Sequence, residues 1–377
     1  MEDRRDIRVM IEEIAMTGDV IRENIERLKR TLDDKKELFG SKKWSKIYAV
    51  GCGDSLFAGQ AAKFAFMRDT GIPFEAVEAL EFCRYEIEYM PENALVFVMS
   101  YSGSVARTIE CALIAQKRGA TVIAITGKPK SRLAKEADNI VLFEIKSLGF
   151  APGTISFTAS LMVLYMCSVK LGAATNHINE AQEKDRYREL AEIADIADKT
   201  IKECDEPAKQ IAEIYKDRVK YYFIGAGPNY PIAHFGAAKM IEGGEVDGIP
   251  QGTEEWAHEQ YFVVAERDIT IVIAPYGNSI SRAQEVIKEM DFINTGNLLI
   301  TTEKGSFINT KNKIVIPGDV WEGYSPLLTT IVLSLFSYYV SFSNGKSSYN
   351  FKSEEQEKEH YDTLHISRFS DELENIK

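Results

Sequence analysis

Short runs of apolar residues alternate with longer amphipathic stretches along most of this 377-residue chain. The apolar runs predict strands, and the stretches with helical periodicity between them predict helices. Almost continuous apolar strands that alternate with helices are typical of a parallel sheet covered on both faces. The elements predicted in the first half are strands at Ile47–Gly51, Phe74–Leu80, Leu95–Ser100, Thr121–Thr126 and Ile140–Ile145 and helices at Ser55–Arg68, Ser104–Arg118 and Phe157–Lys170.

The second half of the chain repeats this order. Gly51 corresponds to Gly225 and Gly103 corresponds to Gly277, in both cases 174 residues later. Because the two offsets are equal, two whole domains correspond, and we interpret the chain as a tandem duplication. We expect an α/β fold with two tandem domains, each a five-stranded parallel sheet flanked by helices. The strands predicted for the second domain are Tyr221–Gly225, Glu245–Ile249, Ile269–Ala274, Leu298–Thr302 and Lys313–Pro317.

Segments of a different character surround the two repeats. The apolar run Pro326–Phe342 is short and carries threonine and serine, so we interpret it as a core helix rather than a membrane span. The polar end of the chain predicts a tail that packs on the body or on a partner subunit. The expected division is a helical lead-in at residues 1–40, domains at 41–178 and 205–343, a charged bridging helix at 179–204 and the tail at 344–377.

Composition narrows the classes of partner. The formal charge of −12, with acidic residues spread over the predicted helices, argues against a nucleic-acid partner. The N-terminus lacks the apolar core and cleavage site of a signal peptide, so we expect a cytoplasmic protein without a membrane segment. The odd number of cysteines and the absence of C-x-x-C spacing argue against disulfides and a zinc site. These cysteines are Cys52, Cys83, Cys111, Cys167 and Cys204.

Two loops rich in glycine and serine follow strands of the first domain and open helices. Their hydroxyl and backbone N–H groups are expected to converge at the carboxyl edge of the sheet, beside helix N-termini that favour anions. Such loops can hold a phosphate without a basic residue. The alternative is that the serines only cap helices and the glycines only make turns. The candidate ligand residues are Gly53, Ser55, Ser100, Ser102 and Ser104.

The second domain carries acid/base chemistry instead. Its corresponding loops contain proline, which offers no N–H, so we expect a poor phosphate cradle. Lys239 and Glu242 lie at i, i+3 on a predicted helix Ala233–Glu242. Glu255 and His258 repeat that spacing on a short helix that Thr253 is expected to cap, so the carboxylate can orient the imidazole.

A carboxylate and an imidazole near one sugar suffice to open its ring and to move a proton between adjacent carbons. A phosphorylated sugar is therefore the small-molecule ligand that the two domains together indicate. The alternative for Glu242 and His258 is that both are solvated surface residues on amphipathic helices. No H-E-x-x-H spacing or other metal-ligand pattern is present in the sequence.

Four motifs make the chain recognisable. Together they resemble the tandem sugar isomerase (SIS) domain family, specifically the isomerase half of glucosamine-fructose-6-phosphate aminotransferase and the fructosamine-6-phosphate deglycases and deaminases. The resemblance covers nearly the whole chain beyond the N-terminal helix and implies a Rossmann- or flavodoxin-like three-layer sandwich for each domain. The motifs are Gly51-Cys-Gly-Asp-Ser55, Ser100-Tyr-Ser-Gly-Ser104, Gly236-Ala-Ala-Lys-Met-Ile-Glu242 and Glu255-Trp-Ala-His258.

The resemblance also implies roles for single residues, with no cofactor and no metal. Glu242 is expected to carry the proton between C1 and C2, and Lys239 to lie near the sugar. His258 is expected to open the ring from a neighbouring subunit, which implies a homodimer. The residues implied to contact the phosphate are Ser55, Ser100, Tyr101 and Ser102.

The chain departs from the family at several positions. Asp54 and Val105 stand where the family has threonine, which removes a hydroxyl and adds a negative charge; Arg107 is expected to compensate. Thr154 and Ser156 remain as partial substitutes in a segment where the family has Ser-Thr-Lys. The start of the chain, Met-Glu-Asp, lacks the cysteine nucleophile of a glutaminase domain, so we do not expect it to take nitrogen from glutamine on its own.

The sequence therefore favours a phosphosugar isomerase, deglycase or deaminase that acts on a ketose or ketosamine phosphate. Two alternatives stay open. One is a non-catalytic sensor that binds a sugar phosphate and reports it to a partner. The other is an enzyme whose ligand lacks the usual phosphate, because of Asp54 and Val105.

Overall fold

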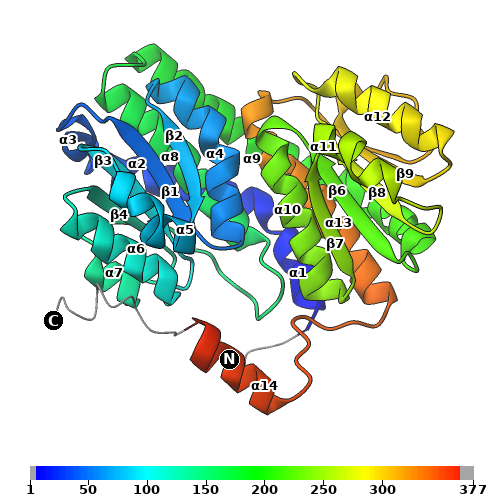
Figure 1. Cartoon of the computed structure of the whole chain (residues 1–377). Helices are drawn as coiled ribbons and strands as arrows, with labels where there is room; N and C mark the ends of the chain where they lie inside the picture. Colours follow the sequence, from blue (N-terminus) through cyan, green and yellow to red (C-terminus); the bar gives the residue numbers. More distant parts are fainter. Residues whose placement is uncertain (1–5, 366–377) are drawn as a thin grey trace. The chain divides into compact units, whose positions relative to one another are not determined.

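The computed structural model describes residues 6–365, and its contacts divide the chain into two compact units. The first unit contains Arg22–Ile145 and Ser156–Arg188, together with the segment from Phe351 onward. The second contains the N-terminal segment up to Ile21, Lys146–Ile155 and Glu189–Asn350. Each unit holds one five-stranded parallel sheet flanked by helices (Figure 1). The predicted fold class is confirmed.

The sheet of the first unit has the strand order β2-β1-β3-β4-β5. The strands are β1 (Lys46–Gly51), β2 (Phe74–Glu78), β3 (Ala94–Met99), β4 (Thr121–Thr126) and β5 (Asn139–Leu142). The helices of this unit are α2 (Thr17–Asp33), which begins in the other unit, α3 (Lys36–Gly40), α4 (Asp54–Thr70), α5 (Ala79–Arg84), η1 (Glu86–Tyr89), α6 (Ala106–Lys117), α7 (Arg132–Glu136), α8 (Ile155–Ala174) and the C-terminal α14 (Glu354–Glu359) and η7 (His360–His365).

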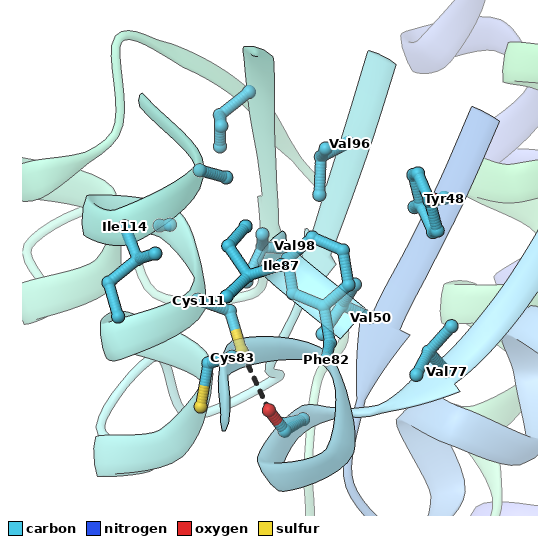
Figure 2. Packing of buried hydrophobic residues seen from close by; sticks show 14 of the residues in the cluster. Tyr48, Val50, Val77, Phe82, Cys83, Ile87, Val96, Val98, Cys111 and Ile114 are labelled. Atoms are coloured by element: carbon cyan, nitrogen blue, oxygen red, sulfur yellow. Dashed lines mark hydrogen bonds between the residues drawn. The ribbon is translucent and has the colours of Figure 1, made fainter. Parts of the chain in front are cut away.

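Strand β3 shows why this sheet is buried on both faces. Alternate residues of a strand point to opposite sides. On one side Phe97 packs on Phe66 of α4 and Phe39 of α3. On the other side Val96 and Val98 join a cluster with residues of α5 and α6, among them Phe82 and Ile114 (Figure 2). Apolar residues at every position of the strand therefore contribute to one of two cores.

The sheet of the second unit has the order β10-β9-β8-β6-β7, the same topology as the first when its own strands are counted. Its strands are β6 (Lys220–Gly225), β7 (Asp247–Gly252), β8 (Ile269–Ile273), β9 (Gly296–Thr302) and β10 (Lys313–Ile316). Its helical elements are α1 (Arg8–Ile14), α9 (Glu180–Tyr215), which begins in the first unit, η2 (Gly227–Asn229), α10 (Tyr230–Lys239), η3 (Met240–Gly244), α11 (Thr253–His258), η4 (Gln260–Phe262), α12 (Ile280–Phe292), η5 (Glu303–Gly305), η6 (Glu322–Tyr324) and α13 (Pro326–Ser343).

Several element boundaries differ from the prediction. The bridging helix α9 continues through Pro207 to Tyr215, because Ala208 and Ile211 keep burying its apolar face. The helix predicted to end at Glu242 ends as an α-helix at Lys239 and continues as the π-turn η3. The tail beyond residue 365 lies outside the described residues.

Two helices are long and apolar enough to cross a membrane by length and composition alone, α8 and α13. In the structure, 94% of the apolar window of α8 and 83% of that of α13 is buried inside the protein. This burial is the environment of a core helix, the interpretation that the serine and threonine content of Pro326–Phe342 indicated.

The glycine that ends β6 is required by close packing. A Cβ atom at Gly225 would overlap the backbone carbonyl of Asn229, where the chain turns back over the strand end. We expect Gly225→Ala to lower the free energy of unfolding by about 2–4 kcal/mol, measured by urea denaturation. Gly252, its register partner on β7, has only ordinary contacts from 3.8 Å, so Gly252→Ala is the matched control. Equal losses in the two variants would contradict this account.

Candidate functional site

The first glycine-serine loop joins β1 to α4. Gly53 has φ +52°, a conformation that glycine adopts without strain, and is the N-cap of α4. Asp54 is the first residue of the helix, where its negative charge meets the positive end of the helix dipole. Ser55 follows in the first turn and packs closely under Gly51, since a Cβ there would lie 2.7 Å from that of Ser55.

The second loop, Ser100–Ser104, follows β3 and is folded by its own hydrogen bonds. The N–H of Gly103 donates to Ser100 Oγ over 3.1 Å, and that of Ser104 donates to Ser102 Oγ over 3.3 Å. The exposed hydroxyls of Ser102 and Ser104 lie 2.8 Å apart. The side chain of Ser104 does not cap α6, whose N-cap is Val105. The hydroxyls of Ser100 and Ser102 shape the loop itself, and the ligand contacts of these serines stay predictions.

The two loops lie at the topological switch point of the first sheet. Strands β1 and β3 are neighbours, while the chain leaves β1 towards β2 on one side and β3 towards β4 on the other. Open α/β sheets bind ligands at the carboxyl ends of such strands. The loops at Gly53–Ser55 and Ser100–Ser104 thus meet at the edge where a ligand is expected.

Two further residues of this region are held by protein contacts. The ring of Tyr101 lies 5.7 Å from that of Phe143, with Lys128 Nζ 5.1 Å from its centre. Arg107 forms an ion pair with Glu110, a fully buried carboxylate that also binds Arg84 over 2.9 Å. The triad of two arginines and one glutamate has one net positive charge. The substrate contacts of Tyr101 and Arg107 stay predictions.

The corresponding loops of the second unit are filled by the chain itself. The amide of Asn229 donates to Ser325 over 2.8 Å and accepts from Thr329 over 2.9 Å. At the counterpart of the Gly103 loop, the N–H of Asn278 donates to the Glu322 carboxylate over 3.0 Å. A Cβ at Gly277 would overlap the same carboxylate. An internal anion therefore occupies the loop that was predicted to be a poor phosphate cradle.

Lys239 and Glu242 meet at the end of α10, as their spacing predicted. The ammonium of Lys239 lies 2.8 Å from Glu242 Oε2, and the lysine side chain has no exposed surface. Phe235 packs 4.9 Å from the same ammonium. Glu242 itself lies in the π-turn η3 and its side chain is 27% exposed. The turn thus exposes the Glu242 carboxylate to solvent, while the buried ammonium of Lys239 holds one of its oxygens.

Two segments distant in sequence cover this turn. The N–H of Tyr349 donates to the backbone carbonyl of Glu242 over 2.9 Å. A Cβ at Gly243 would approach Pro152 to 3.5 Å, so the segment that carries Thr154 also lies here. Thr154 is buried, and its hydroxyl donates to Glu13 over 3.4 Å. Ser156 belongs to the other unit, where its carbonyl accepts from Ser160.

The contact of His258 corrects one prediction. His258 Nε2 lies 3.3 Å from Glu254 Oε1, whereas Glu255 was expected to orient the imidazole. Residues at i, i+4 are stacked along a helix, which brings Glu254 under the ring. Both side chains are more than half exposed, so the contact contributes little. The helix α11 starts after Gly252, and Thr253 is not its cap.

Glu254 also binds Arg282, with the guanidinium Nε 2.7 Å from Oε2. That hydrogen bond, followed by the positive charge of Arg282 and then by His258, lowers the pKa of Glu254. The structure thus keeps Glu254 ionised beside the imidazole of His258. Sequence reasoning missed Glu254 because a spacing of three and a spacing of four both place a carboxylate on the same helix face.

The first unit also has a cavity of about 600 Å³ at its opposite, amino edge, lined by the ends of α3, α4 and α8. The serine loops are not part of its lining. Among the described residues 6–365, no group of three or more His, Cys, Asp or Glu side chains has the arrangement of a metal site.

Comparison with known proteins gives two matches to one domain type. A sequence model of the SIS domain matches residues 42–170 and 213–344. The isomerizing glutamine–fructose-6-phosphate aminotransferase of Clostridium tetani is 28% identical over 338 residues, which are 89% of this chain and 54% of that enzyme. The chain spans about half the length of the curated relatives it matches.

Solved structures share the fold. The C-terminal domain of glucosamine-fructose-6-phosphate aminotransferase from Francisella tularensis has a TM-score of 0.83 at 24% identity, covering 91% of this chain and 98% of that one. Glucosamine-6-phosphate deaminase from Thermotoga maritima has a TM-score of 0.65 at 20% identity, covering 87% and 95%. At these identities the similarity establishes the architecture.

Cys52 lies inside the first loop, and its environment makes it a poor nucleophile. Burial, followed by the charge of Glu78, whose Oε1 is 3.5 Å from Sγ, raises the pKa of the Cys52 thiol to about 12. We expect iodoacetamide to modify Cys52 at pH 8 about 1,000-fold more slowly than a free thiol, measured by peptide mass spectrometry. Glu78→Gln should accelerate the reaction. Modification of wild-type Cys52 as fast as that of glutathione would contradict this account.

Proposed function

We propose that this chain, which belongs to the SIS domain family, is an enzyme that moves a proton between C1 and C2 of a phosphorylated ketose or ketosamine. The observation that carries the proposal is the ion pair between Lys239, the last residue of α10, and Glu242 in the π-turn η3. Burying the ammonium of Lys239 is costly, and an apolar side chain at position 239 would stabilise the fold equally well. Single π-turns inserted in helices are frequent at functional sites.

In the proposed reaction the Glu242 carboxylate removes a proton from C1 of the open ketose while O2 gains a proton from water, which gives an enediol. Glu242 then returns its proton to C2 while O1 loses its proton to water, which gives the aldose. For a ketosamine the same transfer gives an imine at C1, and addition of water then releases the amine. Lys239 holds one carboxylate oxygen at 2.8 Å and so orients the base. General acid–base catalysis of this kind contributes about 10²–10⁴-fold in rate.

His258 is assigned the ring-opening step, in which a cyclic sugar transfers a proton from its anomeric hydroxyl to its ring oxygen. The imidazole is 67% exposed, so it is accessible to a substrate bound by another chain. A homodimer in which His258 completes the site of the neighbouring subunit is part of the proposal. The Glu254 carboxylate is its orienting partner.

The anionic end of the substrate is assigned to the serine loops of the first unit. Their position at the switch point and the exposed hydroxyls of Ser102 and Ser104 support this assignment. The second unit offers an internal comparison, because there the equivalent loop binds the carboxylate of Glu322.

A substrate without phosphate is the second candidate. Asp54 is the first residue of α4, where its carboxylate already meets the helix N-terminus. A second anion at that position is repelled unless Arg107 offsets the charge. A neutral or amino sugar derivative would avoid this repulsion.

The proposed base has a direct test. We expect Glu242→Gln to lower kcat about 10²–10⁴-fold on the substrate that the wild type converts, among fructose 6-phosphate, glucosamine 6-phosphate, fructosamine 6-phosphates and their unphosphorylated forms. NMR in deuterated water measures exchange at C1 and C2. Glu303→Gln, an exposed carboxylate after β9, is the control. Undiminished turnover in Glu242→Gln would remove Glu242 as the base.

The imidazole contact has a separate test. We expect His258→Gln to lower kcat/KM on ring-closed substrate by about 10²-fold and to have little effect on an open-chain analogue. Glu254→Gln should cause a smaller loss, of a few-fold, because both groups are exposed. Glu255→Gln should have no effect. A large loss in Glu255→Gln with none in Glu254→Gln would restore the pairing that the sequence predicted.

A further inference from the structure

The N-terminal helix α1 carries a carboxylate on its buried face. Val9, Met10 and Ile14 are buried on that face, and Glu13 lies among them with 5% of its surface exposed. Burying a carboxylate is costly unless hydrogen bonds compensate. Burial raises the pKa of Glu13, and hydrogen bonds from Leu148, Ser147 and Thr154 oppose that rise. If α1 served only to pack against the core, we would expect an apolar residue at position 13.

Both oxygens of Glu13 hold one irregular segment. Oε1 accepts from the N–H of Leu148 over 2.9 Å and from the hydroxyl of Ser147 over 3.0 Å. Oε2 accepts from the hydroxyl of Thr154 over 3.4 Å. The segment between these contacts, residues 147–154, is irregular except for an isolated β-bridge at Phe150. The carboxylate therefore ties its two ends together.

The middle of the same segment rests on the turn that carries Glu242. The Phe150 ring lies 4.8 Å from that of Tyr349, whose N–H donates to the carbonyl of Glu242. Pro152 is buried beside Gly243, the residue that follows Glu242. All of these residues belong to the second unit. A shift of the segment would reach both Thr154 and the Glu242 turn.

We propose that Glu13 is a positioning residue, which fixes segment 147–154 so that Thr154 and the Glu242 turn keep the geometry that the substrate requires. The inference rests on the proposed function for the role of Glu242 and on the predicted substrate contact of Thr154. Glu13 does not touch the substrate in this account. It makes the helical lead-in a part of the site, because the lead-in supplies an anchor for both ends of an otherwise irregular loop.

The test compares Glu13→Ala and Glu13→Gln with Glu12→Ala, a change at the exposed neighbour on the same helix. We expect Glu13→Ala to accelerate hydrogen exchange at the Leu148 amide about 10-fold, since that amide loses its acceptor. We also expect kcat/KM to fall about 10–100-fold through misplacement of the site. Glu13→Gln keeps the shape of the side chain and one acceptor oxygen. It should therefore restore most of the protection of the Leu148 amide and most of kcat/KM. Glu12→Ala should change neither.

A double-mutant cycle separates positioning from a general loss of stability. Thr154→Val removes the hydroxyl that Glu13 holds. If Glu13 acts through Thr154, the double variant loses no more kcat/KM than the larger single loss. Losses that multiply, or a Glu13→Ala enzyme within twofold of wild type, would overturn the proposal. Unchanged exchange at Leu148 in Glu13→Ala would also overturn it, even if wild type converts no substrate and the proposed function itself fails.

Discussion

A lysine side chain without exposed surface is costly to bury unless its ammonium has a partner, and in this chain Lys239 pairs with Glu242. The neighbouring elements of the second unit are arranged around this pair. The helix α10 widens into a π-turn after Lys239, which carries Glu242 out to partial exposure while Oε2 stays on the ammonium. Gly243 and Gly244 leave room for neighbouring segments to close over the turn. A catalytic base needs this combination, in which the carboxylate is held in one orientation and one side of it is open to a substrate.

The duplication explains how one chain comes to have two different halves. Both sheets have the same strand order, so both have a switch point with two strand-end loops. In the first unit the second loop ends in exposed hydroxyls, whereas in the second unit Glu322 fills the corresponding turn. The two copies have therefore diverged at the same position, one with exposed hydroxyls and the other with an internal contact. The residues proposed for acid/base chemistry, Glu242 and His258, lie in helical elements of the second copy, outside its strand-end loops.

Much of the fold follows from local patterns that a single sequence displays. Apolar runs such as the one at β3 are read directly because a strand buried on both faces leaves no polar positions. The Lys239–Glu242 pair was predictable for a similar reason, since helical spacing fixes which side chains meet. The π-turn was not, because it depends on residues far away, among them Tyr349 and Pro152, that pack against it.

The errors at the site have the same origin. The choice between Glu254 and Glu255 as the partner of His258 depends on a rotation of one residue around a short helix, and Arg282 on another helix decides it. Glu13 is visible in the sequence as a carboxylate on the apolar face of an amphipathic helix. Its hydrogen-bond partners, Ser147 and Leu148, lie more than 130 residues away and cannot be identified from that pattern. Long-range hydrogen bonds of this kind have no pattern in a window of neighbouring residues.

A crystal structure of the protein with glucitol 6-phosphate, an open-chain analogue that cannot react, tests the central claim most directly. The account predicts a carboxylate oxygen of Glu242 about 3–3.5 Å from C1 and C2, the distance of a near-attack geometry. A bound analogue whose C1 and C2 lie beyond about 6 Å from every Glu242 carboxylate in the assembly would contradict it.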